Sequence, residues 1–108
     1  MIKSDLSRIQ GYIGIANKAN YVIFGADNLK GYSHKLFLVL YREDCGKTIS
    51  KVVEELKQRE IPNYVFSIEE FNSISNLENC KLLAIKNKGL SQKIIEIIDK
   101  VWFIHIMM

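Results

Sequence analysis

Hydrophobic residues along the chain follow two alternating patterns, one typical of amphipathic helices and one typical of short buried strands. Spacings of three and four residues between apolar side chains predict helices over residues 6–19, 49–58 and 90–98. Short apolar runs predict strands at 22–24, 36–41, 64–66 and 81–85. Two short helices are expected, one after Gly25 and one from residue 67 to about residue 72. This alternation of helices and strands predicts an α/β fold, a three-layer α/β/α sandwich.

Polar residues near the starts of the predicted helices are expected to cap them. Ser4 or Asp5 can cap the first helix. Ser67 is followed three residues later by Glu70, which predicts a capping box at the start of the helix after the third strand. The flanking residues of this box, Phe66 and Phe71, predict a hydrophobic staple.

The second predicted strand, 36–41, is apolar on both of its faces. A strand of this kind is typical of the middle of a sheet that helices cover on both sides, so we expect it to be central and mostly parallel to its neighbours.

Composition indicates one domain over residues 1–100, followed by an apolar extension at 101–108. The chain has 108 residues, is 48% hydrophobic and carries a net charge of +3, which permits binding to a polyanion without requiring it. The extension is expected either to continue a packed element or to form an exposed patch that promotes self-association. No apolar run approaches the roughly 20 residues of a membrane-spanning helix, and the first residues do not resemble a signal peptide. We therefore expect a cytoplasmic protein with no membrane partner.

Candidate catalytic and metal-binding residues do not form an established motif. Gly46-Lys47-Thr48 lies between a strand and a helix as a phosphate-binding loop does, but Tyr41 occupies the position of the first glycine of that motif. Cys45 precedes the same helix and His34 could approach it, although no motif links the two. The two cysteines lack metal-ligand spacing. We expect no catalytic residue, no cofactor and no metal.

The segment that follows the first strand is the strongest candidate for a binding site. The strand ends at Gly25, where a helix is expected to begin. Backbone N–H groups at such a junction lie at the edge of the sheet and suit a phosphate or carboxylate.

The chain resembles the superfamily of the ribosomal proteins L-seven-Ae and L-thirty-e, especially its small bacterial members. The resemblance rests on residues 12–19 (Tyr-Ile-Gly-Ile-Ala-Asn-Lys-Ala), on 22–25 (Val-Ile-Phe-Gly) and on 35–40 (Lys-Leu-Phe-Leu-Val-Leu), and it extends over about residues 6–98. It implies an α/β/α sandwich with a four-stranded mixed sheet. It also implies binding to kink-turn RNA, which many members of the superfamily recognise.

The RNA-binding residues that the resemblance implies follow the first strand. Gly25 and Ala26 match the family's contact motif, whereas Asp27 stands in place of its asparagine and Asn28 in place of its glutamate. Asn28 is expected to hydrogen-bond a base edge. The other implied contacts are neutralisation of phosphate by Lys30 and Lys35 and packing of Ile74 on an extruded nucleotide.

These observations predict a non-enzymatic RNA-binding protein, ribosome-associated or ribosomal-protein-like, that recognises a structured, kink-turn-like RNA. The alternative is a protein-interaction module of the same fold that has lost RNA recognition. Asp27, the short helix after Gly25 and the apolar extension favour this alternative. A small enzyme that uses Cys45 is a third hypothesis.

Overall fold

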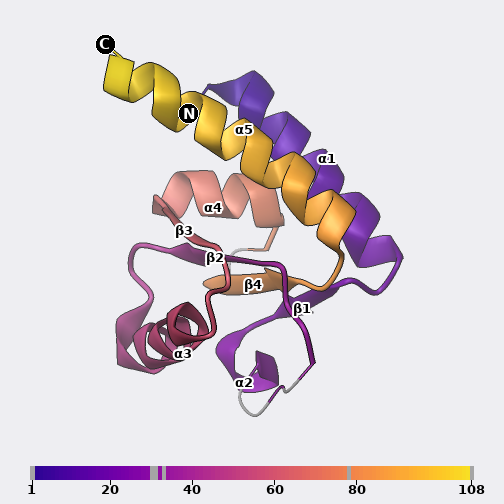
Figure 1. Cartoon of the computed structure of the whole chain (residues 1–108), viewed down its shortest axis with the longest axis vertical. Coiled ribbons are helices and arrows are strands. Elements are labelled where there is room, and N and C mark those ends of the chain that lie inside the picture. The colour runs from indigo at the N-terminus through magenta and orange to yellow at the C-terminus, as the bar shows by residue number, and fades with distance from the viewer. Residues whose placement is uncertain (1, 30–31, 33, 78, 108) are drawn as a thin grey trace.

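The computed structural model describes residues 2–29, 32, 34–77 and 79–107, and for 101–107 it describes the backbone alone. Helices and strands alternate along this part of the chain (Figure 1). The helices are α1 (Lys3–Lys18), α2 (Ala26–Leu29), α3 (Gly46–Gln58), α4 (Ile68–Ser75) and α5 (Lys88–Met107). The strands are β1 (Val22–Phe24), β2 (Leu38–Arg42), β3 (Asn63–Phe66) and β4 (Leu82–Ile85).

The four strands form one mixed sheet in the order β1-β4-β2-β3. The expected central position of β2 is confirmed, but the expectation of mostly parallel neighbours is wrong. β2 is parallel to β3 and antiparallel to β4, and β4 is also antiparallel to β1. Its residues Leu38, Val39 and Leu40 are nevertheless apolar on both faces of the strand because helices cover both sides of the sheet.

The two ends of the sheet carry different residues. Phe24, Arg42, Phe66 and Leu82 lie at one end, which we call the Gly25 end. Val22, Leu38, Asn63 and Ile85 lie at the other, which we call the Lys35 end.

Alternating side chains of the central strands face two separate cores. Leu38 and Leu40 of β2 lie in the core formed with α1, α4 and α5, whereas Val39 lies in the core formed with α3. In the same way β4 contributes Leu83 and Ile85 to the first core and Leu82 and Ala84 to the second. Figure 1 shows the resulting layers, with α1, α4 and α5 on one side of the sheet and α2 and α3 on the other. The predicted three-layer α/β/α sandwich is confirmed.

The start of α4 has the predicted cap. Ser67 Oγ accepts a hydrogen bond from the Glu70 N–H at 3.2 Å, and the Ser67 N–H donates to Glu70 Oε1 at 3.4 Å. Phe66 and Phe71 are both buried in the same core, as a hydrophobic staple requires. The helix continues to Ser75 and is therefore longer than predicted.

The expected cap of α1 is wrong. The helix begins at Lys3, its N-cap is Ile2, and no side chain makes a capping hydrogen bond there. Neither Ser4 nor Asp5 therefore caps it, because both lie inside the first turn.

The C-terminal extension continues α5. Its backbone is helical through Met107. The side chains of 101–108, and with them the expected self-association, lie outside the described residues. None of the helices, over the residues described, combines the length and the apolar character needed to cross a bilayer.

Candidate nucleic-acid interface

Gly25 forms the junction between the edge strand β1 and the single-turn helix α2. Its N–H donates to the Leu82 carbonyl at 2.9 Å, so β1 stays paired with β4 up to this point. Its φ of +86° lies in the left-handed region that glycine adopts at little cost. This conformation lets the chain leave the sheet abruptly and begin α2 at the Gly25 end.

Three separate segments surround a cavity of about 470 Å³ at this end of the sheet. They are residues 25–27 after β1, residues 45–49 at the start of α3, and residues 79–81 before β4. Lys47 and Lys81 line the cavity together with Asp27. The structure thus places two cations here that are far apart in the sequence.

The first turn of α3 adds hydrogen-bond donors to this cavity. Gly46 begins the helix with a φ of +73°, and no side chain caps the turn at Cys45. The first N–H groups of a helix have no partner within the helix and carry its positive dipole end. Because the 13-residue helix has no acidic side chain in its first turn, that partial charge is not neutralised there.

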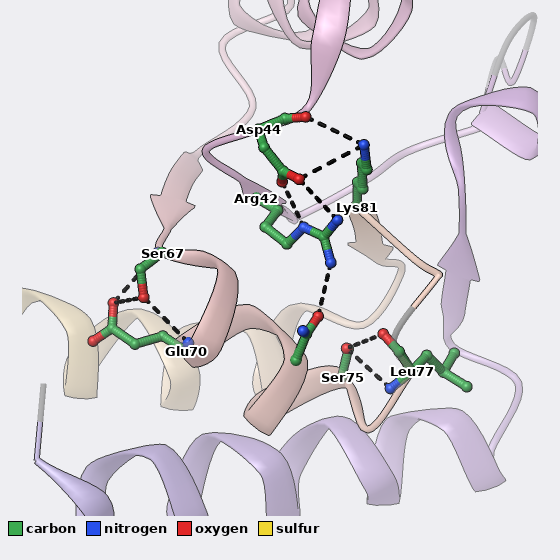
Figure 2. Close-up of polar contacts among 8 residues, drawn as sticks. Arg42, Asp44, Ser67, Glu70, Ser75, Leu77 and Lys81 are labelled. Atoms are coloured by element: carbon green, nitrogen blue, oxygen red, sulfur yellow. Dashed lines mark hydrogen bonds and ion pairs between the residues drawn. The ribbon is translucent and has the colours of Figure 1, made fainter.

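Arg42 lies at the centre of a polar network (Figure 2) that reaches Lys81 of the cavity lining. Arg42 donates to both carboxylate oxygens of Asp44, at 2.5 and 2.9 Å, and to Asn72 Oδ1 of α4 at 2.9 Å. Lys81 Nζ lies 3.3 Å from the Asp44 carbonyl oxygen and 3.7 Å from its carboxylate. The hydrogen bond between Arg42 and Asp44 lowers the pKa of Asp44 and raises that of Arg42. The contacts with Asp44 therefore position the Lys81 side chain beside the cavity that it lines.

Asn28 is exposed, but part of its side chain is already in use. Its Nδ2 donates to the Phe24 carbonyl at 2.7 Å, which ties α2 to the end of β1. Its Oδ1 can accept a hydrogen bond, and the second hydrogen of Nδ2 can still be donated. Because the carboxylate of Asp27 is an acceptor, this segment offers mainly acceptor oxygens to a partner.

The two lysines predicted to neutralise phosphate do not join this cavity in the structure. Lys30 lies outside the described residues. Lys35 lies at the opposite end of the sheet from Gly25. The N–H of the nearby Phe37 donates to the Ile85 carbonyl at 3.0 Å, whereas Gly25 is beside Leu82 at the other end of β4. The structure therefore separates Lys35 from Gly25, Ala26, Asp27 and Asn28.

Ile74 does not have the surface position that its expected role requires. Its side chain is 1% exposed and packs in the core beneath α4. The neighbouring Leu77 is 45% exposed and lines a hollow of about 360 Å³ with Phe24 and Gly25. Asn76, which ends α4 in the left-handed conformation with a φ of 57°, turns the chain so that Leu77 leaves the core. Asparagine after the last apolar helical position was the sequence signal for this exposure.

The two residues of the candidate enzyme site, Cys45 and His34, lie at opposite ends of the sheet. Cys45 Sγ lies 3.6 Å from Ser50 Oγ, and the thiol lines the cavity at the Gly25 end. His34 precedes Lys35 at the Lys35 end, where its carbonyl accepts from Arg59 and its ring meets Tyr32. The structure therefore does not pair Cys45 with His34. Over the described residues, no cluster of three metal-ligating side chains is present.

Comparison with known proteins supports the fold. No family model matches the chain, and no curated protein matches it. Among solved structures, the fold is similar to that of a protein with unknown function from Bacillus halodurans C, with a TM-score of 0.67. The two chains are 20% identical, and the match covers 84% of this chain and 96% of that one. At this level of identity, the likeness shows that the two chains share a fold and shows nothing more.

Proposed function

We propose that this chain is a non-enzymatic, cytoplasmic RNA-binding protein that recognises a structured, kink-turn-like RNA. The observation that carries the proposal is the meeting of three segments around one cavity at the Gly25 end. We call the surface formed by residues 25–28, 45–49, 77 and 79–81 the Gly25 surface. The sequence resemblance to the ribosomal proteins L-seven-Ae and L-thirty-e supports the same proposal, since it places RNA contacts directly after the first strand.

Phosphate binding on this surface would combine two kinds of positive group. The uncapped N–H groups at the start of α3 suit an anionic oxygen. Lys47 and Lys81, which line the same cavity, provide cationic side chains. A sharply bent RNA backbone brings several phosphates to one such place, so recognition would depend mainly on RNA shape.

Base recognition would come from the acceptors and the apolar side chain beside that cavity. Asp27 and the Oδ1 of Asn28 can accept hydrogen bonds from the amino groups of bases, as carboxylates do with the N4 amino group of cytosine. The exposed Leu77 can pack on a base that is turned out of its stack. Leu77 thus takes the place of Ile74 in the proposed interface.

The proposal is tested by binding to a kink-turn RNA, measured by fluorescence anisotropy over a range of salt concentrations. Lys47→Gln should weaken binding and lower the salt dependence by about one unit of slope, as expected for one lost phosphate contact. Lys93→Gln is the matched control, because Lys93 is exposed on α5 in the opposite layer. If the wild type shows no salt-dependent binding at micromolar concentration while a typical family member does, or if both variants weaken binding equally, the proposal is wrong.

A second candidate function is protein interaction through the edge strand β3. One edge of β3 has no neighbouring strand in the described sheet, and Val65 on this strand is 55% exposed. Ile68, directly after the strand, is 41% exposed. Exposed strand edges with apolar side chains favour pairing with another chain. Dimerisation measured by sedimentation, and lost in a Val65→Lys variant, would support this function over RNA binding.

A further inference from the structure

A second cavity, of about 410 Å³, lies at the Lys35 end of the sheet. It is formed by residues 35–37 before β2, residues 59–62 between α3 and β3, and the first half of α5. Its volume lies within the range of about 300 to 1,000 Å³ found for small-molecule sites. It lies at the opposite end of the sheet from the Gly25 surface, so an inference about it does not rest on the RNA-binding proposal.

The walls of this cavity combine an apolar interior with a cationic rim. Leu36 and Ile61 are buried, and Phe37 and Ile95 are half-buried beside them. The charged residues that line the cavity are three cations and one acid: Lys35, Arg59, Lys88 and Glu60. This combination favours a ligand with an apolar body and a negative group.

Two of the rim cations are held in place by neighbouring groups. Arg59 donates to the carbonyl oxygens of Tyr32 at 3.3 Å and of His34 at 3.2 Å. Lys35 Nζ lies 5.4 Å from the centre of the Phe37 ring, within the range of a cation–π contact. The cations are thus partly preorganised, which lowers the entropic cost of binding an anion.

The strongest sign of a ligand is Ser91. This residue is 1% exposed, lies on α5 and lines the cavity. Its Oγ has no hydrogen-bond partner among the described residues. A buried hydroxyl without a partner is costly and rare in folded proteins. An acceptor oxygen bound in the cavity would supply the missing bond.

We propose that this cavity binds a small organic anion. In this proposal the apolar body of the ligand packs between Phe37, Ile61 and Ile95. Its carboxylate or phosphate lies among Lys35, Arg59 and Lys88. One ligand oxygen accepts the hydrogen bond of Ser91 Oγ.

The experiment is a titration of the ¹⁵N-labelled 108-residue chain with phenyl phosphate, followed by amide chemical shifts. Phenyl phosphate should cause saturable shifts that centre on residues 35–37, 59–62 and 88–95. Inorganic phosphate carries the charge alone and benzyl alcohol carries the ring alone, so each should bind more weakly. Shifts that centre on the Gly25 surface, or equal binding by either control compound, would overturn the proposal.

Three variants test the assigned groups. Lys88→Gln should weaken phenyl phosphate binding up to about fivefold, the effect of losing one exposed ion pair. Lys93→Gln, also on α5 but outside the cavity lining, should leave binding unchanged. Ser91→Ala should weaken binding without lowering the melting temperature of the unliganded protein, because the variant removes an unpartnered buried hydroxyl. Wild-type affinity in both Lys88→Gln and Ser91→Ala would show that the proposal is wrong.

Discussion

Arg42 and Asp44 form a bidentate ion pair at the end of β2. The Nε of Arg42 lies 2.5 Å from one carboxylate oxygen of Asp44, and a terminal nitrogen lies 2.9 Å from the other. The same guanidinium also bonds Asn72 of α4 at 2.9 Å, and Asp44 contacts Lys81 before β4 (Figure 2). The Asp44 carboxylate therefore positions both Arg42, which is hydrogen-bonded to α4, and Lys81 of the Gly25 surface.

The Asp44 pair should make stability depend on pH in acid. Its hydrogen bond to Arg42 lowers the pKa of Asp44 below the ordinary value of 3.8, so the folded state binds this proton less readily than the unfolded chain does. The resulting stabilisation is complete above the unfolded pKa and is lost as the pH falls through the folded pKa. Wild type should therefore exceed Asp44→Asn in free energy of unfolding at neutral pH, and this difference should shrink in acid.

Urea unfolding of both proteins at about pH 7 and about pH 3 checks this linkage. Glu54→Gln, which changes an exposed carboxylate of α3, is the control and should show a smaller difference from wild type. A difference between wild type and Asp44→Asn that stays constant across this range would contradict the prediction.

The capping box of α4 should contribute measurably to stability. Ser67→Ala removes the hydroxyl that accepts the Glu70 N–H, so the free energy of unfolding should fall by about 1 kcal/mol. Ser73→Ala lies on the exposed side of the same helix and should change it little, since alanine favours helices. Urea denaturation of the two variants gives the comparison, and equal losses would argue against a specific role for the cap.

Replacing Gly25 and Gly11 by alanine should have opposite effects on stability. In both cases an added Cβ would meet nothing within 4 Å, so packing does not decide the outcome. Gly25→Ala forces a φ of +86° on an L residue and should cost about 1–2 kcal/mol. Gly11→Ala lies within α1 and should stabilise the protein by about 0.5–1 kcal/mol. Thermal unfolding measures both, and a neutral Gly25→Ala would refute the left-handed junction.

Alanine substitutions at Ile74 and Leu77 should separate effects on stability from effects on RNA binding. Ile74→Ala removes a buried side chain and should cost about 2–5 kcal/mol in unfolding free energy. Leu77→Ala changes a side chain that is 45% exposed and should alter stability by less than about 0.5 kcal/mol. If the Gly25 surface binds RNA, Leu77→Ala should nevertheless weaken binding severalfold in the anisotropy assay. Unchanged binding by Leu77→Ala would remove Leu77 from the proposed interface.

Local sequence patterns were sufficient to predict most of the fold. The capping box at Ser67 depends on residues within one turn, and the strand at 22–24 on a short apolar run, so both can be recognised without the rest of the chain. The apolar character of β2 on both faces predicted helices on both sides of the sheet, which is also a local consequence of burial. The first helix was an exception, because its N-cap, Ile2, has no side chain that can accept a capping hydrogen bond.

The candidate site was only partly predictable, because some of its residues have local sequence signals and others are brought there only by strand pairing. Gly25 marks its place because a glycine at the end of a strand indicates a special backbone conformation. Lys47 and Lys81 are ordinary lysines in the sequence, and only the pairing of β2 with β4 brings them to one cavity. Ile74 lies on the apolar face of α4, but the left-handed turn at Asn76 decides that Leu77, rather than Ile74, is exposed.

By itself, then, the sequence determined the elements and the three layers, since periodicity, caps and burial act between near neighbours. The tertiary structure decided the order and direction of the strands, and with them which end of the sheet each loop occupies. Strand pairing joins residues that are far apart in the chain, and it therefore leaves almost no local trace. This pairing places Lys35 beside Arg59 and Lys88 at one end of the sheet, and Lys47 beside Lys81 at the other.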